Sequence, residues 1–132
     1  MKRILGKINP EIIEQWELYD HKNKKIVMYE DAKEHSESKH LNEFSSIEDY
    51  YAVMASLEDI IKNPDYVFYD KLKKGLEYYK NVNSNVLVAV RVDDGSELKV
   101  KSVYPVKQEK IENRKKKEEK TKLYNKYVKG IE

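Results

Sequence analysis

The chain has 132 residues, no cysteine and a formal net charge of +2 from 26 Lys or Arg and 24 Asp or Glu residues. The absence of cysteine excludes disulfides, Cys-ligated zinc and thiol nucleophiles. We expect one soluble domain over residues 1–132, made in the cytoplasm and without membrane contact, because the only apolar stretch near the N-terminus is Ile4-Leu5 and no long apolar run follows.

The first third of the chain predicts a helix, a strand and a second helix. Asn9-Pro10-Glu11 has the capping residue, the proline and the acidic first turn that begin a helix, which would run through Trp16. Residues 24–29 are typical of a short strand. Residues 30–41 have few apolar positions and predict a short, exposed helix.

The best-defined element is a helix predicted over residues 46–62. Apolar side chains recur there at helical spacing, from Ile47 through Met54 to Ile61. Asn63-Pro64-Asp65 ends the helix, because proline disfavours helical geometry in the residue before it and cannot donate a backbone hydrogen bond.

Four strands are predicted next, over residues 66–69, 76–81, 86–92 and 98–104. Short polar turns separate them, so consecutive strands should pair antiparallel. The sequence therefore predicts an α+β fold: a four-stranded antiparallel sheet packed by the N-terminal helices, which makes a core over residues 1–106, followed by a basic C-terminal helix.

That C-terminal helix, over residues 107–129, concentrates positive charge. It carries ten Lys or Arg against four Glu, a net +6, whereas the other residues carry sixteen against twenty, a net −4. Such a block can bind a phosphate backbone by releasing counterions, with Arg114, Lys115, Lys116 and Lys117 as the substrate contacts. A solvated helix with interspersed acidic residues explains the composition equally well.

Two histidines in the segment 30–41 suggest proton transfer. RNA can be cleaved without metal when one group takes the proton of a ribose 2′-hydroxyl and another protonates the leaving 5′-oxygen, and histidine as a residue type titrates near neutrality. On a continuous helix His35 and His40 would point about 140° apart, which disfavours joint metal binding. Both could face one cleft if the helix breaks near Lys39; otherwise they are solvated surface residues.

The predicted strands offer further polar groups at the ends of apolar faces. Strict alternation places Ser102 and Tyr104 on the face of Leu98 and Val100. Alternation likewise places Arg91 with Leu87 and Ala89, and Lys80 with Leu76 and Tyr78. The hydroxyl pair could hold a phosphate, although packing at a sheet edge is the more frequent role of such residues.

Together these features resemble a known family. The residues that carry the resemblance are Gly6-Lys7-Ile8 with Glu11-Ile12-Ile13, the paired histidines, the run 57–65, the strands 76–80 and 86–92, and the ending Lys101-Ser102-Val103-Tyr104-Pro105. They are similar to the phage and mobile-element branch of the Barnase-EndoU-Colicin-RelE nuclease superfamily, and the likeness spans most of the chain.

The resemblance implies a metal-independent endoribonuclease that needs no cofactor. His35 and His40 would match the catalytic histidines, Ser102 and Tyr104 the strand pair, and either Lys80 or Arg91 the basic group. A toxin or effector of this kind would act on RNA, could be delivered to a target cell, and would need an antitoxin or immunity protein. The alternatives are a nucleic-acid-binding module without catalysis, or a structural protein of a phage or mobile element.

Overall fold

Six strands form one mixed sheet in the computed structural model, which describes residues 2–121 and, within that range, side chains up to residue 117. The strands lie in the order β1-β2-β6-β5-β4-β3. Their bounds are Lys2–Lys7 (β1), Lys25–Tyr29 (β2), Tyr66–Asp70 (β3), Gly75–Asn81 (β4), Asn85–Arg91 (β5) and Glu97–Pro105 (β6). The part of the predicted C-terminal helix beyond residue 121 lies outside the described residues.

The predicted four-stranded antiparallel sheet is therefore wrong in strand number and in one pairing. Strands β3 to β6 do form the expected antiparallel succession, but β2 pairs parallel to β6 through Lys25 to Val27, and β1 pairs antiparallel to β2. Polar turns signal pairing between consecutive strands only, so the pairing of β2 with a strand about seventy residues later has no local signature.

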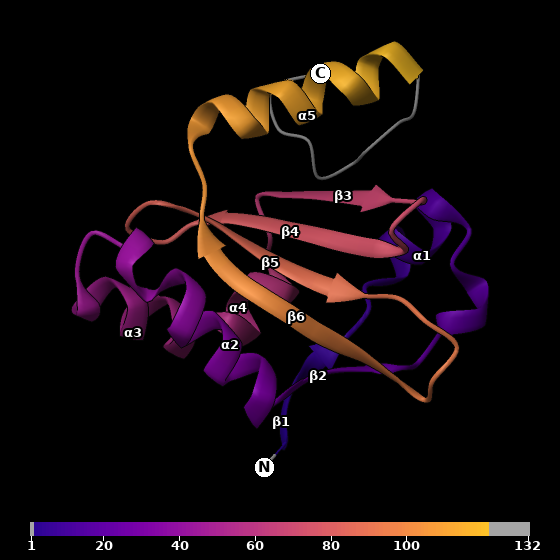
Figure 1. The fold of residues 1–132 in the computed structure, drawn as a ribbon. Helices are drawn as coiled ribbons and strands as arrows, with labels where there is room; N and C mark the ends of the chain where they lie inside the picture. Colours follow the sequence, from indigo (N-terminus) through magenta and orange to yellow (C-terminus); the bar gives the residue numbers. More distant parts are fainter. Residues whose placement is uncertain (1, 122–132) are drawn as a thin grey trace.

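Five α-helices pack around this sheet in the part of the chain described (Figure 1): Pro10–Trp16 (α1), Glu30–His40 (α2), Ile47–Ala55 (α3), Leu57–Lys62 (α4) and Gln108–Thr121 (α5). Short 3₁₀ turns lie at Tyr19–His21 (η1) and Leu41–Glu43 (η2). None of the helices among the described residues is long and apolar enough to cross a bilayer.

The helix predicted over residues 46–62 is two helices. Its start is as expected, because the Ser46 side chain accepts the Asp49 N–H at 3.1 Å. The break falls at Ser56, whose φ and ψ of −98° and 4° leave the helical region and whose hydroxyl donates to the Ala52 carbonyl at 2.8 Å. A serine that bonds back one turn bends a helix in this way.

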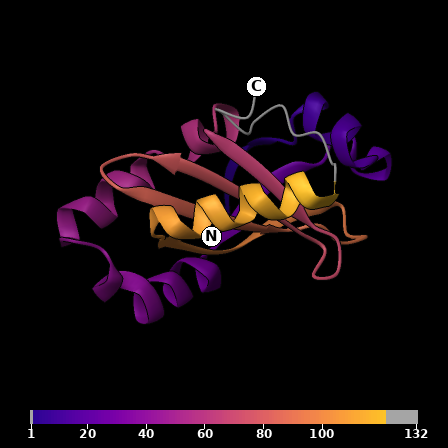
Figure 2. The same ribbon diagram turned by 90° about the horizontal axis from the view of Figure 1, so that it is seen from above.

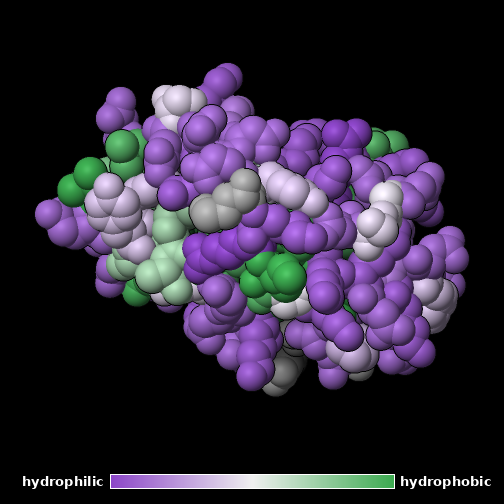
Figure 3. All heavy atoms as spheres, turned by 90° about the horizontal axis from the view of Figure 1, so that it is seen from below, coloured by the Kyte–Doolittle hydropathy of each residue, from purple (hydrophilic) through white to green (hydrophobic). Residues whose placement is uncertain are grey.

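Two apolar clusters lie on opposite faces of the sheet. The larger cluster joins α1, α3 and α4 to one face, and the smaller consists of Phe68, Tyr79, Leu87 and Ile111, through which α5 lies across the other face (Figure 2). Seen from below, the molecule is mostly hydrophilic at its surface, with small hydrophobic patches (Figure 3). The sheet is therefore covered on both faces, and α5 is one of the covering elements.

Glu97 ties together the three strands that the mixed pairing brings side by side. Its carboxylate accepts from Lys2 Nζ of β1 at 2.8 Å and from the Tyr29 hydroxyl of β2 at 2.5 Å. The hydrogen bond from Lys2, followed by that from Tyr29, holds the pKa of Glu97 below its ordinary value. A lowered folded-state pKa stabilises the fold above the unfolded pKa, and this stabilisation is lost as the pH falls through the folded value.

Replacing Glu97 with glutamine should therefore lower the melting temperature at pH 7, and the loss should be smaller at about pH 3, because the stabilisation declines once the pH is below the unfolded pKa of about 4.3. Thermal unfolding followed by circular dichroism at both pH values measures the difference. Glu14→Gln, an exposed change on α1, is the control and should have little effect at either pH. Equal losses for Glu97→Gln at both pH values would contradict the role of its charge.

Candidate active site on strand β6

Helix α2 lies where a continued strand β2 would have paired with β6. Strand β2 ends at Tyr29 and α2 begins at Glu30, whereas β6 runs on beyond its last partner in β2. The Ser36 hydroxyl of α2 accepts the Val103 backbone N–H at 3.0 Å, and Ser36 is the only buried polar residue in the described part of the chain. Ser36 thus gives the Val103 N–H of β6 a hydrogen-bond partner and fixes α2 on the edge of that strand.

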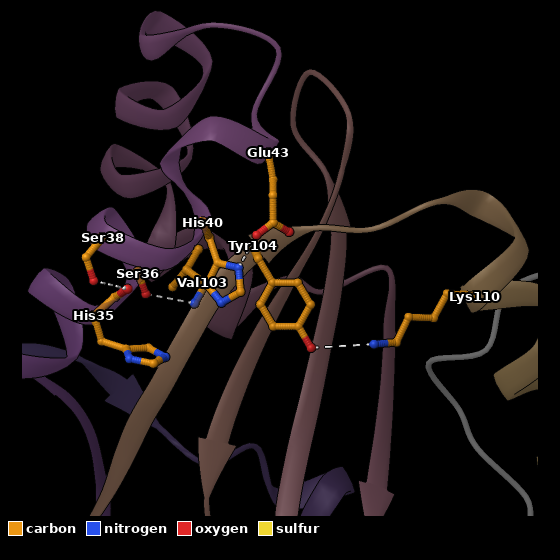
Figure 4. A network of polar contacts seen from close by, with 8 residues as sticks. All are labelled: His35, Ser36, Ser38, His40, Glu43, Val103, Tyr104 and Lys110. Atoms are coloured by element: carbon orange, nitrogen blue, oxygen red, sulfur yellow. Dashed lines mark hydrogen bonds and ion pairs between the residues drawn. The ribbon is translucent and has the colours of Figure 1, made fainter.

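The two histidines of α2 point the same way, over β6 (Figure 4). Their ring centroids are 6.0 Å apart in an edge-to-face arrangement. His40 is the last residue of α2, and its φ and ψ of −120° and −7° depart from helical values, so the angle expected on a continuous helix does not apply. The His40 ring stacks on Tyr104 at 4.7 Å with planes inclined by 25°.

Glu43 orients the His40 ring. Its Oε2 lies 2.5 Å from His40 Nδ1, an ion pair when the imidazole is protonated. With a proton on Nδ1, His40 keeps Nε2 free to accept a proton, and the carboxylate stabilises the imidazolium that results. Glu43 was not predicted from the sequence, although its position three residues after His40 is a contact spacing on helical turns.

Tyr104 connects the histidines to α5 (Figure 4). Its hydroxyl lies 3.5 Å from Lys110 Nζ, and the same ammonium is 5.3 Å from the ring centroid. The four side chains His35, His40, Tyr104 and Lys110 therefore follow one another from α2 across β6 to α5. Lys110 was also missed, because only the packing of α5 on the sheet brings it to Tyr104.

A bulge changes the faces predicted for β6. The pairing with β5 shifts between Ala89–Ser102 and Val90–Val100, which leaves Lys101 as the extra residue. Ser102 and Tyr104 therefore point to the face opposite Leu98 and Val100, so strict alternation was wrong here. The bulge places both hydroxyl-bearing side chains on the face that carries α5.

The two candidate basic residues lie on opposite faces of the sheet. Arg91 pairs with Lys99 across β5 and β6, on the face of Tyr104. Lys80 lies on the other face, where its ammonium donates to the Asn63 carbonyl at 2.5 Å and is 3.5 Å from Asp59. The Asn63 amide and then the Lys80 charge lower the pKa of Asp59. Lys80 is thus not brought together with the histidines, whereas Arg91 is on their side.

Two hollows flank the stack of His40 on Tyr104. The α2-side hollow, about 660 Å³, is lined by Tyr29, Asp31, Ala32, His35, Arg91, Lys99, Val100 and Lys101. The α5-side hollow, about 550 Å³, has as its charged and aromatic lining residues Glu43, Tyr104, Lys107, Glu109, Lys110, Arg114 and Lys117.

The four basic residues predicted as substrate contacts separate into two pairs. Arg114 lies 5.0 Å from the Phe68 ring and 3.0 Å from Glu77, and Lys115 donates to the Tyr66 hydroxyl at 3.0 Å. These two side chains are each only 14% exposed. They hold α5 on the sheet, whereas Lys116 and Lys117 are exposed and Lys117 lines the α5-side hollow.

Comparison with known proteins identifies one family. The model of the phage-Barnase-EndoU-ColicinE5/D-RelE like nuclease3 family (PBECR3) matches residues 2–113, which include all six strands and the start of α5. No curated protein and no solved structure matches the chain. Among the described residues, no group of three His, Cys, Asp or Glu side chains is arranged to hold a metal ion.

Proposed function

The chain belongs to the phage-Barnase-EndoU-ColicinE5/D-RelE like nuclease family, and from this premise we propose that it is a toxin- or effector-like endoribonuclease that acts without metal or cofactor. The observation that supports this proposal most is the convergence of His35, His40 and Tyr104 on one side of β6. Two imidazoles within one nucleotide's reach can supply both proton transfers that cleavage needs.

In the proposed reaction the ribose 2′-oxygen attacks the adjacent phosphorus while the bond from phosphorus to the 5′-oxygen breaks. His40, oriented by Glu43, takes the 2′-hydroxyl proton, and His35 gives a proton to the leaving 5′-oxygen. The products are a 2′,3′-cyclic phosphate and a 5′-hydroxyl. Lys110, which lies against the Tyr104 hydroxyl, and Arg91 would stabilise the charge of the phosphorane.

Purified protein should cleave single-stranded RNA in excess chelator and leave 2′,3′-cyclic phosphate ends, which mass spectrometry of the fragments identifies. His21→Ala is the control, since His21 lies in η1, its Nδ1 contacts Lys24 at 2.9 Å, and it lines neither hollow beside the histidines of α2. That variant should cleave at the parent rate. Binding of RNA without any cleavage between about pH 5 and 9 would leave only a nucleic-acid-binding module.

The assignment of acid and base has its own test. A substrate with sulfur in place of the scissile 5′-oxygen has a leaving group that needs no proton. His35→Ala should be slow on ordinary RNA and close to the parent on the sulfur substrate, whereas His40→Ala should be slow on both. The reverse pattern would exchange the two roles.

A further inference from the structure

Positive charge is in excess on both sides of the His40–Tyr104 stack. In the α2-side hollow the three cations Arg91, Lys99 and Lys101 face one carboxylate, Asp31. In the α5-side hollow four cations face two carboxylates, Glu43 and Glu109. Two of these cations have a further carboxylate beside them, since Arg91 lies 3.7 Å from Asp93 and Arg114 lies 3.0 Å from Glu77, so the lysines carry the remaining positive charge of the hollows.

The two hollows lie on either side of the place where the proposed reaction occurs. His35 lines the α2-side hollow, Tyr104 lines the α5-side hollow, and His40 contacts both rings. A nucleic-acid strand carries one phosphate per nucleotide, so a strand with its scissile phosphate at the stack has a further phosphate on each side. Cations in both hollows suit a strand that continues in both directions.

The lysines that line the hollows are exposed to solvent. Lys99 and Lys101 alternate with buried residues on β6 and are exposed, as are Lys107 and Lys117 beside the other hollow. By contrast, Arg114, which lies next to Phe68 and Glu77, is largely buried. The contacts to substrate are therefore expected from these lysines rather than from Arg114.

We propose, on the basis of the function proposed above, that the substrate is single-stranded RNA that crosses β6 between α2 and α5, with the phosphate on one side of the scissile bond held by Lys99 and Lys101 and that on the other side by Lys107 and Lys117. Cleavage is then internal to the strand. A dinucleotide, which has no flanking phosphates, is a poor substrate.

The test combines two double variants with substrates that lack one charge. Lys99→Met with Lys101→Met removes the α2-side cations, and Lys107→Met with Lys117→Met removes the α5-side cations, while methionine keeps much of the apolar stem. The substrates are DNA nonamers with a single central ribonucleotide, one for each base. Each is made with normal linkages, or with one neutral methylphosphonate immediately 5′ or 3′ of the cleavable bond.

In the parent protein, each neutral linkage should lower kcat/KM by about tenfold, the effect of one charge-assisted contact. In the Lys99 and Lys101 variant, the neutral linkage should no longer lower kcat/KM at one of its two positions. In the Lys107 and Lys117 variant, it should no longer lower kcat/KM at the other position. Lys7→Met with Lys22→Met, two exposed lysines at another hollow, is the matched control and should respond as the parent does.

A loss of response at the same position in both variants, or unchanged responses in both, would overturn the proposal. So would a parent protein that cleaves dinucleotides as fast as nonamers. The proposed function has failed only if the protein cleaves neither the four nonamers nor ordinary RNA. Whenever the nonamers are not cleaved, fluorescence anisotropy with the same nonamers reads the same pattern in binding. Absence of that pattern in anisotropy would overturn the two-sided strand path as well.

Discussion

Replacing His40 with alanine should lower the rate of RNA cleavage by roughly 10²-fold or more, the usual contribution of a positioned acid or base. His40 is the side chain that touches both His35 and Tyr104 and that Glu43 orients. Its loss removes the proposed base and the stacking partner of Tyr104 together. Single-turnover cleavage of a labelled RNA measures the effect.

Glu43→Gln removes the charge beside the His40 imidazole while the imidazole itself stays. Glutamine can still accept a hydrogen bond from His40 Nδ1 but carries no charge to stabilise the imidazolium. We expect a smaller fall in kcat than for His40→Ala, with KM nearly unchanged, as for an interaction that matters in the transition state.

If His40→Ala cleaves at the parent rate with unchanged melting temperature, the proposed role of His40 is wrong.

The parts of the fold that depend on local signals were predictable from the sequence. Helix α1 begins at Asn9-Pro10 as the capping pattern indicated, and strands β3 to β6 lie within one or two residues of the predicted ranges. In each case a capping residue or a polar turn of a few residues indicates where the helix or strand begins or ends. The two histidines also stood out, because they are close in sequence and carry a recognisable chemistry.

The remaining parts depend on contacts between distant segments. Nothing near Lys25 indicates that β2 lies beside β6, and a single extra residue at Lys101 exchanges the faces of Ser102 and Tyr104. Lys110 reaches Tyr104 only because Ile111 packs into the smaller apolar cluster. The candidate site was therefore predictable in its histidines, Tyr104 and Arg91, and not in Glu43 and Lys110.

Ser36→Ala should destabilise the protein by about 1–3 kcal/mol, because the buried Val103 N–H then has no hydrogen-bond acceptor. The same change loosens α2 on the edge of β6. Since α2 carries His35 and His40, we expect slower RNA cleavage even at temperatures where the variant is folded. Urea unfolding and cleavage at about 15 °C below the melting temperature measure the two effects.

Ser38→Ala is the matched control for this prediction. Ser38 lies two residues from Ser36 on the same helix, but it is exposed and its hydroxyl donates to the His35 carbonyl at 3.2 Å. Its loss should change stability by no more than about 0.5 kcal/mol. Equal effects of the two substitutions would mean that the Val103 N–H finds another partner. In that case the hydroxyl of Ser36 does not fix α2, and the packing of Ala32 and Leu41 against the large cluster would have to position both histidines.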